Sequence, residues 1–329
     1  MTHFTRRDML HSVAALAVTA ALPAAAQTDW PIKPISVIVP FPPGGSVDLA
    51  GRLVNAPLAK ILGQPVVIDN RAGAGGAIGA AYVAHAPKDG YTLIVASQST
   101  HVANPAIRPN LGYDAINDFS FITILNRVAN ILVVHPSLPV KTFSEFVQYA
   151  RAKPGELNYA SPGNGSLAHL SMEMLKSKLG LSITHVPYRG GGPALSDLLG
   201  GQVQLMWDNL SPQLPHVQAN KVRALALASP GRSPQLPDVP TFDELRLPEL
   251  NLTSWTGLAA PAGTPRPVID KLYRAIRDIV TTPANQELWR AKGLLTPEAM
   301  TPEEYTNEVK DRIKIFRDIV KANNITIDG

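Results

Sequence analysis

The chain has 329 residues, with 30 prolines, 24 glycines, no cysteine and a formal net charge of +4 at pH 7. Without cysteine it can form neither disulfides nor thiolate metal sites, so its stability must come from a buried core, and its length is enough for two lobes. The mild charge, with no run of lysine or arginine, excludes nucleic acid as an expected partner.

A secretory signal is expected at residues 1–26. Arg6 and Arg7 precede an alanine-rich apolar run at residues 13–22, and small residues follow up to Ala26. The run is shorter than the roughly 20 residues that span a bilayer, which favours cleavage near Ala26 over a retained anchor. The paired arginines are typical of twin-arginine export, with Sec export as the alternative. The mature protein is therefore expected outside the cytoplasm.

Beyond the signal, short β-branched runs alternate with amphipathic segments, which predicts βα units around mainly parallel sheets. Helices are expected after Asp48, with a kink or interruption at Pro57, and from Ser166 to a C-cap at Gly180. A third helix should begin at Thr301, because the sequence TPEE combines an N-cap threonine, a first-turn proline and a capping-box glutamate. The expected strands are residues 35–39, 66–68, 92–95, 131–134, 183–186, 203–206 and 224–227.

Two segments are expected to cross between the lobes. One is the apolar stretch at residues 121–134, and the other is the proline-rich region at 230–255. Crossing at both would place residues 27–127 together with 251–329 in one lobe and residues 128–250 in the other. Such a discontinuous layout leaves a cleft between the two lobes.

Four glycine-rich turns each follow a strand directly and precede a helix. They lie at residues 40–46, 70–76, 160–166 and 187–193. In open α/β sheets, turns of this kind lie at the carboxyl ends of the strands, where ligands bind. Glycine lets the backbone approach a ligand, and a helix N-terminus favours an anion. The four turns could therefore close on a carboxylate, or each could only satisfy the geometry of its strand-to-helix connection.

Polar side chains of these turns have two possible roles. Ser46, Ser161 and Ser166 could offer hydroxyl groups to a ligand or cap the following helices. Arg71 and Arg189 are candidate partners for a carboxylate, although either could face solvent at the rim. The sequence leaves both alternatives open.

Five further residues are candidates of the same kind. Tyr188 could stack on the solute, and Asp208 with Asn209 could read a polar group of the ligand or cap a local turn. His101 and His169 lie near candidate cleft loops, where a structural role is favoured over contact with a ligand.

Enzyme motifs are weak or missing. The glycines at residues 73–79 resemble a dinucleotide loop, but the next strand lacks the acidic residue that would bind a ribose. There is no GxSxG nucleophile elbow and no HExxH zinc motif, so no cofactor or metal is expected. The remaining enzymatic alternative is an exported hydrolase or isomerase that uses Ser166, His169 and Asp208.

Five motifs carry a family resemblance. They are PFPPGGSVD at residues 40–48, DNRAGAGG at 69–76, APKDGYTL at 86–93, NYASPGNGS at 158–166 and VPYRGGG at 186–192. In this order, and over nearly all of the expected mature chain, they resemble the Bug family of extracytoplasmic solute receptors, which serve tripartite tricarboxylate transport systems. Lys88 and Trp207 depart from the family pattern, and Trp207 leaves the size of the pocket open.

The resemblance implies a type II periplasmic-binding-protein fold, with two α/β lobes and a ligand cleft between them. It also implies a periplasmic receptor, and not an enzyme, that captures a small anionic solute bearing a carboxylate for a tripartite tricarboxylate-type membrane transporter or a sensor. A monomer without cofactor or metal is expected. The expected ligand-binding residues are Phe41, Pro43, Gly44, Gly45, Ser46, Ser97, Ser99, Thr100, His101, Ser161, Gly165, Ser166, His169, Tyr188, Gly191, Gly192, Pro193 and Asp208.

Overall fold

The computed structural model describes residues 30–108, 110–295 and 299–326, so the expected signal at residues 1–26 lies outside the described residues. The chain divides into two units after Ile32, and the fold that follows is that of the unit beginning at Lys33. None of the described helices has the length and apolar character needed to cross a membrane.

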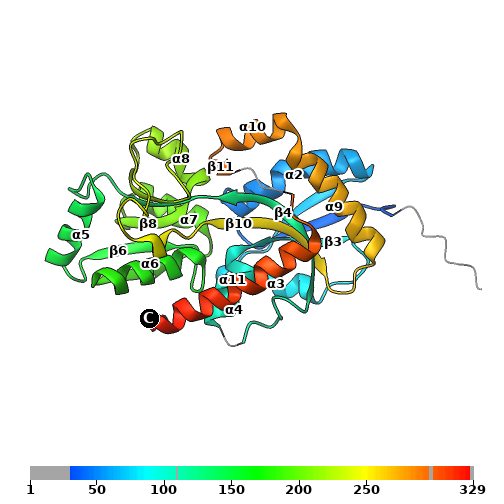
Figure 1. Ribbon diagram of the computed structural model, residues 1–329, viewed down its shortest axis with the longest axis horizontal. Coiled ribbons are helices and arrows are strands. Elements are labelled where there is room, and N and C mark those ends of the chain that lie inside the picture. Colours follow the sequence, from blue (N-terminus) through cyan, green and yellow to red (C-terminus); the bar gives the residue numbers. More distant parts are fainter. Residues whose placement is uncertain (1–29, 109, 296–298, 327–329) are drawn as a thin grey trace, which may run out of the picture. The chain divides into compact units, whose positions relative to one another are not determined.

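The first sheet has six strands in the order β11-β4-β10-β3-β1-β2 (Figure 1). β1 pairs in parallel with β2 and β3, whereas β10 is antiparallel to both β3 and β4. The strands are β1 (Ile35–Val39), β2 (Val66–Asn70), β3 (Thr92–Ser97), β4 (Phe119–Val128), β10 (Ser254–Pro261) and β11 (Leu294–Leu295). The helices around it are α2 (Ser46–Leu62), α3 (Ala77–Ala84), α4 (Asn104–Ile107), α9 (Arg266–Thr281), α10 (Pro283–Ala291) and α11 (Pro302–Ala322).

The second sheet has five strands in the order β7-β6-β8-β5-β9. β6 is parallel to β7 and β8, and β5 is antiparallel to β8 and β9. The strands are β5 (Asn130–Val134), β6 (Leu157–Ser161), β7 (Ile183–Pro187), β8 (Leu205–Asn209) and β9 (Arg223–Ala228). The helices around it are α5 (Phe143–Ala152), α6 (Leu167–Leu179), α7 (Gly191–Leu199) and α8 (Leu210–Gln218).

The prediction of mainly parallel sheets is wrong, because each sheet is mixed. The antiparallel strands β4, β5 and β10 lie at the centre of the sheets and not at their edges. Of these, β4 was expected only as part of the crossing segment at residues 121–134, and β10 was not predicted as a strand. All eight residues of β10 are buried, so the strand lacks the alternation of apolar and polar residues that marks a half-exposed strand in a sequence.

The segment that connects the two sheets between β4 and β5 is very short. β4 ends at Val128 and β5 begins at Asn130, so a single residue separates the strands of the two sheets. On the return, Leu252 and Ser254 lie beside Asn130. The Asn130 amide donates a hydrogen bond of 2.5 Å to the Leu252 carbonyl, and the Ser254 hydroxyl lies 3.0 Å from Asn130 Oδ1. The two passages are therefore bonded directly to each other.

Helix α2 is continuous through Pro57, so the expected interruption does not occur. Val54 and Leu58, on either side of this proline, are both fully buried. Burial of two large apolar side chains contributes about as much as an internal proline costs, roughly 3 kcal/mol. The helix ends at Gly63, whose φ of 69° lies in the left-handed region that favours glycine.

The two other helix predictions are confirmed at their ends. α6 follows Ser166, whose hydroxyl accepts the backbone N–H of His169, and it closes on Gly180 with a φ of 63°. α11 begins with a complete capping box, in which Thr301 and Glu304 exchange side-chain and backbone hydrogen bonds. Both helices therefore start where their capping residues indicate.

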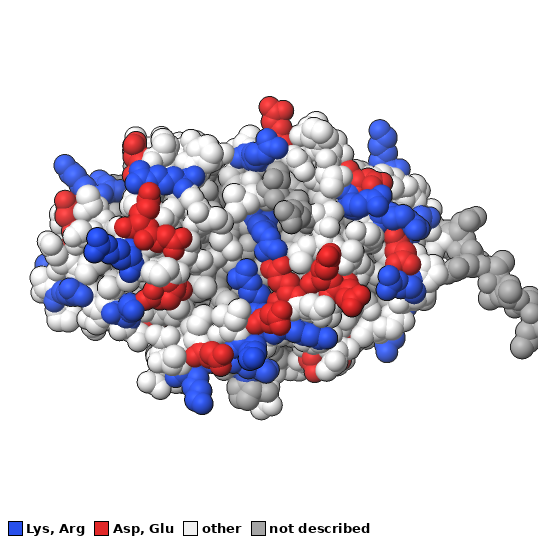
Figure 2. Space-filling view, viewed as in Figure 1, with Lys and Arg blue, Asp and Glu red and all other residues white. Residues whose placement is uncertain are grey.

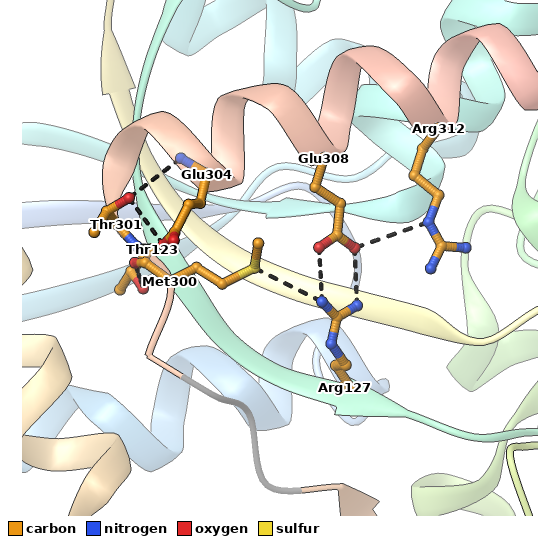
Figure 3. A network of polar contacts seen from close by, with 7 residues as sticks. All are labelled: Thr123, Arg127, Met300, Thr301, Glu304, Glu308 and Arg312. Carbon is orange, nitrogen blue, oxygen red and sulfur yellow. Dashed lines mark hydrogen bonds and ion pairs between the residues drawn. The ribbon is translucent and has the colours of Figure 1, made fainter.

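Helix α11 is tied to the crossing strand β4 by polar contacts (Figure 3). Arg127 of β4 donates two hydrogen bonds, of 2.8 and 2.6 Å, to the two carboxylate oxygens of Glu308 on α11. Arg312 lies one turn further along α11, 3.8 Å from Glu308. Thr123 of β4 donates a hydrogen bond of 2.7 Å to the carbonyl of Met300, just before α11. These contacts fix the first half of α11 against the segment that joins the two sheets.

The far end of α11 leads to the other sheet. Ile325, just beyond the helix, belongs to the core cluster formed by residues of the second sheet, among them Leu132 and Trp207. Tyr305, near the start of α11, instead belongs to the core of the first sheet with Trp255. The helix is therefore anchored in both cores.

Candidate functional site

Two adjoining cavities lie where the strand-to-helix turns of the two sheets meet. Their volumes are about 420 and 480 Å³, including space open to solvent. Both are lined by residues on the first-sheet side, such as Ser46 and Ser99, and by residues on the second-sheet side, such as Asp208 and Asn209. The carboxyl ends of β1, β3 and β8 therefore contribute to one continuous site, as expected for open α/β sheets.

Two of the helices that begin at this site follow glycine-rich turns. α2 starts at Ser46 after Gly44 and Gly45, and α7 starts at Gly191 after Gly190. Gly45, Ser46 and Gly191 all line the larger cavity. The unpaired N–H groups and the dipole of each helix start make this region favourable for an anion.

The structure brings together ten of the predicted site residues and leaves eight outside the two cavities. Those that line a cavity are Phe41, Gly44, Gly45, Ser46, Ser97, Ser99, Ser166, Gly191, Gly192 and Asp208. Those that do not are Pro43, Thr100, His101, Ser161, Gly165, His169, Tyr188 and Pro193.

The serines of the turns have several roles. The Ser46 hydroxyl accepts a short hydrogen bond from the side-chain amide of Asn209. Ser166 caps α6, and the Ser99 hydroxyl accepts a hydrogen bond of 3.2 Å from the backbone N–H of Leu167, the first residue of that helix. These contacts join the turns of one sheet to those of the other. Ser46, Ser99 and Ser166 thus combine a structural role with a position on the cavity wall.

His101 is a core residue. Its ring is fully buried and lies edge-on to Phe119 and Phe121, with ring centroids 4.5 and 5.5 Å away. Nδ1 of His101 is 2.8 Å from the Thr100 hydroxyl. Burial lowers the pKa of His101 to about 3, so the ring is neutral at physiological pH. The structural role favoured for this histidine agrees with its position.

His169 supports the third glycine-rich turn from behind. Its Nδ1 accepts a hydrogen bond of 3.3 Å from the backbone N–H of Gly165, and its ring stacks on His185 at 4.3 Å between centroids. His185 in turn lies 2.7 Å from the Ser161 hydroxyl through Nε2. Burial lowers the pKa of His169 to about 4, and burial with the nearby His169 lowers that of His185 to about 3. The two neutral rings position the turn and do not face the cavities.

Tyr188 turns away from the cavities. Its hydroxyl donates a hydrogen bond of 2.7 Å to Asp197. Burial, and to a smaller extent this hydrogen bond, raises the pKa of Tyr188 to about 12. Gly190 close by has a φ of 143° and faces Pro42 across the cleft, where an added Cβ would lie 2.2 Å from Pro42 Cδ. The fourth turn therefore meets the first through a contact that only glycine can make.

The two candidate arginines lie elsewhere. Arg71 forms an ion pair of 2.8 Å with Asp69, and its guanidinium stacks on Tyr82 at 3.6 Å from the ring centroid. Arg189 is exposed, and neither arginine lines a cavity. The structure therefore agrees with the alternative in which both arginines lie outside the cavities. It gives no support to their role as partners of a bound carboxylate.

Asp208 is the one charged residue among the described residues that line the cavities, and it lines both. Its neighbour Trp207 points to the opposite face of β8, where it is fully buried and stacks on Phe242 at 4.9 Å. Burial raises the pKa of Asp208 to about 6, against the lowering effect of hydrogen bonds from Gln213 and the Asn209 backbone. Trp207 thus packs in the core, while Asp208 gives the cavities their one ionisable side chain among the described residues.

Several lining residues were not predicted. Gln98, Ser254, Trp255 and Thr256 line the smaller cavity. Gln98 is 1% exposed, and both polar atoms of its amide lack a hydrogen-bond partner among the described residues. A polar residue directly after a buried strand was the available signal for Gln98. The residues of β10 gave no such signal, because β10 itself was not predicted.

Comparison with known proteins gives consistent matches over most of the chain. The family model described as "Tripartite tricarboxylate transporter family receptor" matches residues 50–325. BugT of Bordetella pertussis is 38% identical over 302 residues, which cover 92% of each chain. A solved structure described as a periplasmic transporter is 44% identical, covers 91% of this chain and 99% of its own, and superposes with a TM-score of 0.88. MatC from Rhodopseudomonas palustris, solved with bound malate, is 38% identical over 88% of this chain and 100% of its own, with a TM-score of 0.85.

Proposed function

Because this chain belongs to the tripartite tricarboxylate transporter receptor family, we propose that it captures a small carboxylate-bearing solute in the two joined cavities without transforming it. Family membership confirms the resemblance to Bug receptors and the two-lobed α/β fold of periplasmic binding proteins. The family is one of receptors and not of enzymes.

The observation that carries the proposal is the convergence of two helix N-termini on a cavity whose described lining holds no lysine, arginine or histidine. An anion there would be held by N–H groups from the starts of α2 and α7 and by hydroxyls such as that of Ser99. Helix starts and hydroxyls stabilise a carboxylate without a counter-charge. The malate in MatC supports the same class of ligand.

The hydrolase alternative has no assembled machinery. The Ser166 hydroxyl accepts the backbone N–H of His169, while the His169 ring accepts the backbone N–H of Gly165. Asp208 accepts a hydrogen bond from Gln213. The three groups thus bond to other partners, whereas a triad requires them to bond to one another in sequence.

The layout of the chain completes the proposal. Residues 27–127 with 251–329 would form one lobe and residues 128–250 the other, which is supported by the passage between the sheets at Ala129 and by the start of β10 at Ser254. The end of α11 is shared, since Ile325 packs into the second core. Solved relatives are periplasmic proteins. Residues 1–26 would direct export and be removed near Ala26, and the monomeric receptor would deliver its solute to membrane transporter subunits or to a sensor.

A ligand screen tests the proposal. Thermal unfolding and titration calorimetry with aliphatic mono-, di- and hydroxycarboxylates, with amino acids and uncharged analogues for comparison, should give saturable binding to at least one carboxylate. Gly191→Leu should weaken that binding by more than about tenfold, because the new side chain would enter the cavity beside Asp208. Gly231→Leu, at a position with open space around it, should bind as the unaltered protein does. Turnover of the ligand, or no carboxylate bound, would refute the proposal.

A further inference from the structure

We propose that binding of a carboxylate is coupled to the uptake of one proton by Asp208, so that the receptor takes its ligand together with a proton. This inference rests on the proposed function, since it concerns the same cavities. It adds a regulatory property that the fold and the family do not by themselves imply: the affinity for the solute depends on pH.

The position of Asp208 is the reason why a bound carboxylate would require a proton. It is the last residue but one of β8, it is 6% exposed, and it lines both cavities. A Cβ on Gly191 at the start of α7 would lie 3.9 Å from Asp208 Oδ1, so the carboxyl group faces the same helix start that favours an anion. A ligand carboxylate at that helix start would lie beside this carboxyl group. Two negative charges in such an enclosed space are strongly unfavourable, and protonation of one removes the repulsion.

No other charged group relieves the repulsion. The elements packed against β8 carry His169, Glu173, Lys176 and Lys178 on α6, Asp197 on α7, His216 on α8 and Tyr159 on β6, and β5 carries no ionisable side chain. Across the cleft, Asp48 of α2 is paired with Arg52 at 2.8 Å. None of these groups lines either of the two cavities of the candidate site.

Those neighbours also have local partners. Glu173 accepts hydrogen bonds from Tyr159 and Lys176, and Asp197 accepts one from Tyr188. The pKa of Asp208 is raised by burial and lowered by hydrogen bonds from Gln213 and from the Asn209 backbone, with no contribution from a neighbouring charge. The charge of a bound ligand would therefore be the main charge that acts on the pKa of Asp208.

Gln213 can accept a hydrogen bond from the protonated carboxyl group of Asp208. Its Nε2 donates a hydrogen bond of 2.9 Å to Asp208 Oδ2, while its Oε1 is buried and has no hydrogen-bond partner among the described residues. A half-turn of the amide exchanges these two atoms and places Oε1 against Oδ2. A protonated Asp208 would then donate its O–H to Oε1 and satisfy the acceptor that is unpaired when the carboxyl group is ionised.

The direction of the pH effect follows from the two states. In the free protein the pKa of Asp208 is about 6, so the group is mostly ionised at pH 7. A bound carboxylate raises this pKa further, so binding at neutral pH takes up close to one proton. Between the two pKa values the affinity falls by about tenfold for each unit of rising pH.

Titration calorimetry of the full mature protein tests the coupling. A carboxylate that the screen identifies, with malate as the first probe, is titrated at pH 7 in phosphate and in Tris, whose ionisation enthalpies differ. The proton count comes from the difference in apparent enthalpy, and the affinity is measured from about pH 6 to about pH 8. We expect uptake of close to one proton and a decline in affinity of about tenfold per unit in the upper part of this range.

Two variants locate the proton. Asp208→Asn should lose both the proton uptake and the pH dependence, because the amide is neutral throughout. Asp238→Asn removes an exposed carboxylate outside the cavities and should keep both properties. If Asp208→Asn does not fold, the buffer dependence of the unaltered protein still decides whether a proton is taken up.

Three outcomes overturn the proposal. Binding with no proton uptake refutes it and leaves the receptor function intact. That result, with binding restricted to ligands that carry an ammonium or hydroxyl group, would mean that an ionised Asp208 accepts a hydrogen bond from the ligand. Uptake that persists in Asp208→Asn assigns the proton elsewhere. If no carboxylate in the panel binds, the proposed function fails first and the coupling fails with it.

Discussion

The side-chain amide of Asn209 donates a hydrogen bond to the hydroxyl of Ser46, and so joins the end of β8 in one sheet to the start of α2 in the other. Asn209 Oδ1 accepts at the same time a hydrogen bond of 2.6 Å from Ser254, which lies at the passage between the sheets. One side chain thus links both walls of the cleft to the passage between the two sheets. The two walls of the cleft are therefore held together by side chains of the protein itself.

Removing the Ser46 hydroxyl should weaken ligand binding by about fivefold, measured by titration calorimetry. Ser46→Ala deletes the acceptor of the Asn209 amide, and loss of one such hydrogen bond between partly buried groups costs about 1 kcal/mol. The cost falls on the closed state, in which the two walls meet. Ser196→Ala, which loses only an exposed contact within α7, should bind as before. Equal affinities in the two variants would show that the contact does not contribute to closure.

Gly190→Ala should prevent full closure. The new Cβ would lie 2.2 Å from Pro42 Cδ, and the φ of 143° is itself unfavourable for alanine. Because the clash arises between the fourth turn and the first, the open form is spared. We expect a loss of affinity of more than about tenfold, and solution scattering in saturating ligand should still show the larger radius of gyration of the open form. Gly231→Ala is the matched control, and a variant of Gly190 that closes normally would refute the clash.

Glu308→Gln should lower the free energy of unfolding by about 2 kcal/mol. This value lies between those for exposed and for fully buried ion pairs, since the Arg127 and Glu308 side chains are 30% and 14% exposed. The substitution leaves Arg127 beside Arg312 without the carboxylate between them. Chemical denaturation measures the change, with Asp311→Asn on the exposed side of α11 as the control. A loss no larger than the control's would show that the pair adds nothing.

The same ion pair predicts a pH dependence of stability. Burial raises the pKa of Glu308, but the hydrogen bonds and charge of Arg127 and the charge of Arg312 outweigh it, so that the pKa lies below its usual value of 4.5. A carboxyl group with a depressed pKa in the folded state stabilises the fold above its unfolded pKa and loses this contribution as pH falls. Denaturation midpoints should therefore fall less steeply below about pH 4.5 in Glu308→Gln than in the unaltered protein. Parallel curves would contradict the assignment.

Gly257→Ala should destabilise the first core by about 2 kcal/mol or more, because an added Cβ would lie 2.2 Å from the Tyr305 hydroxyl. Tyr305 is fully buried between Phe121 and Trp255, so its ring has little room to move. Thermal unfolding measures the effect. Because the ring carbon Cζ would also lie only 2.5 Å away, Tyr305→Phe should not rescue the variant, and a full rescue would mean that the hydroxyl alone fills the space.

The position of the site could be predicted from the sequence because glycine-rich turns are local signals. Gly45 and Gly191 precede or begin helices, and their placement after short apolar runs indicates strand ends without knowledge of the rest of the fold. The same reasoning identified Asp208, which follows a β-branched and apolar run. Local patterns of this kind are independent of tertiary packing.

The partners of individual side chains could not be predicted in this way. Arg71 was a candidate for binding a ligand carboxylate, yet it contacts Asp69 and Tyr82 instead. The spacing of these residues in the sequence does not decide between a ligand and these two side chains as its partners. Thr256 and Gln98 line the same cavity only because β10, from far along the chain, pairs with β3. Contacts between distant segments depend on topology, which the periodicity of each segment leaves open.

The anchoring of α11 in both cores has a consequence for how the affinity of this receptor can be adjusted. A movement that opened the cleft would shift the helix against one of its two anchors, and its work would include the packing of Ile325 and the contacts of Arg127, neither of which lines the two cavities. The measured affinity is the intrinsic affinity of the closed site reduced by the work needed to populate it. Substitutions along α11 can therefore make the receptor bind more or less tightly while every atom that touches the solute stays the same.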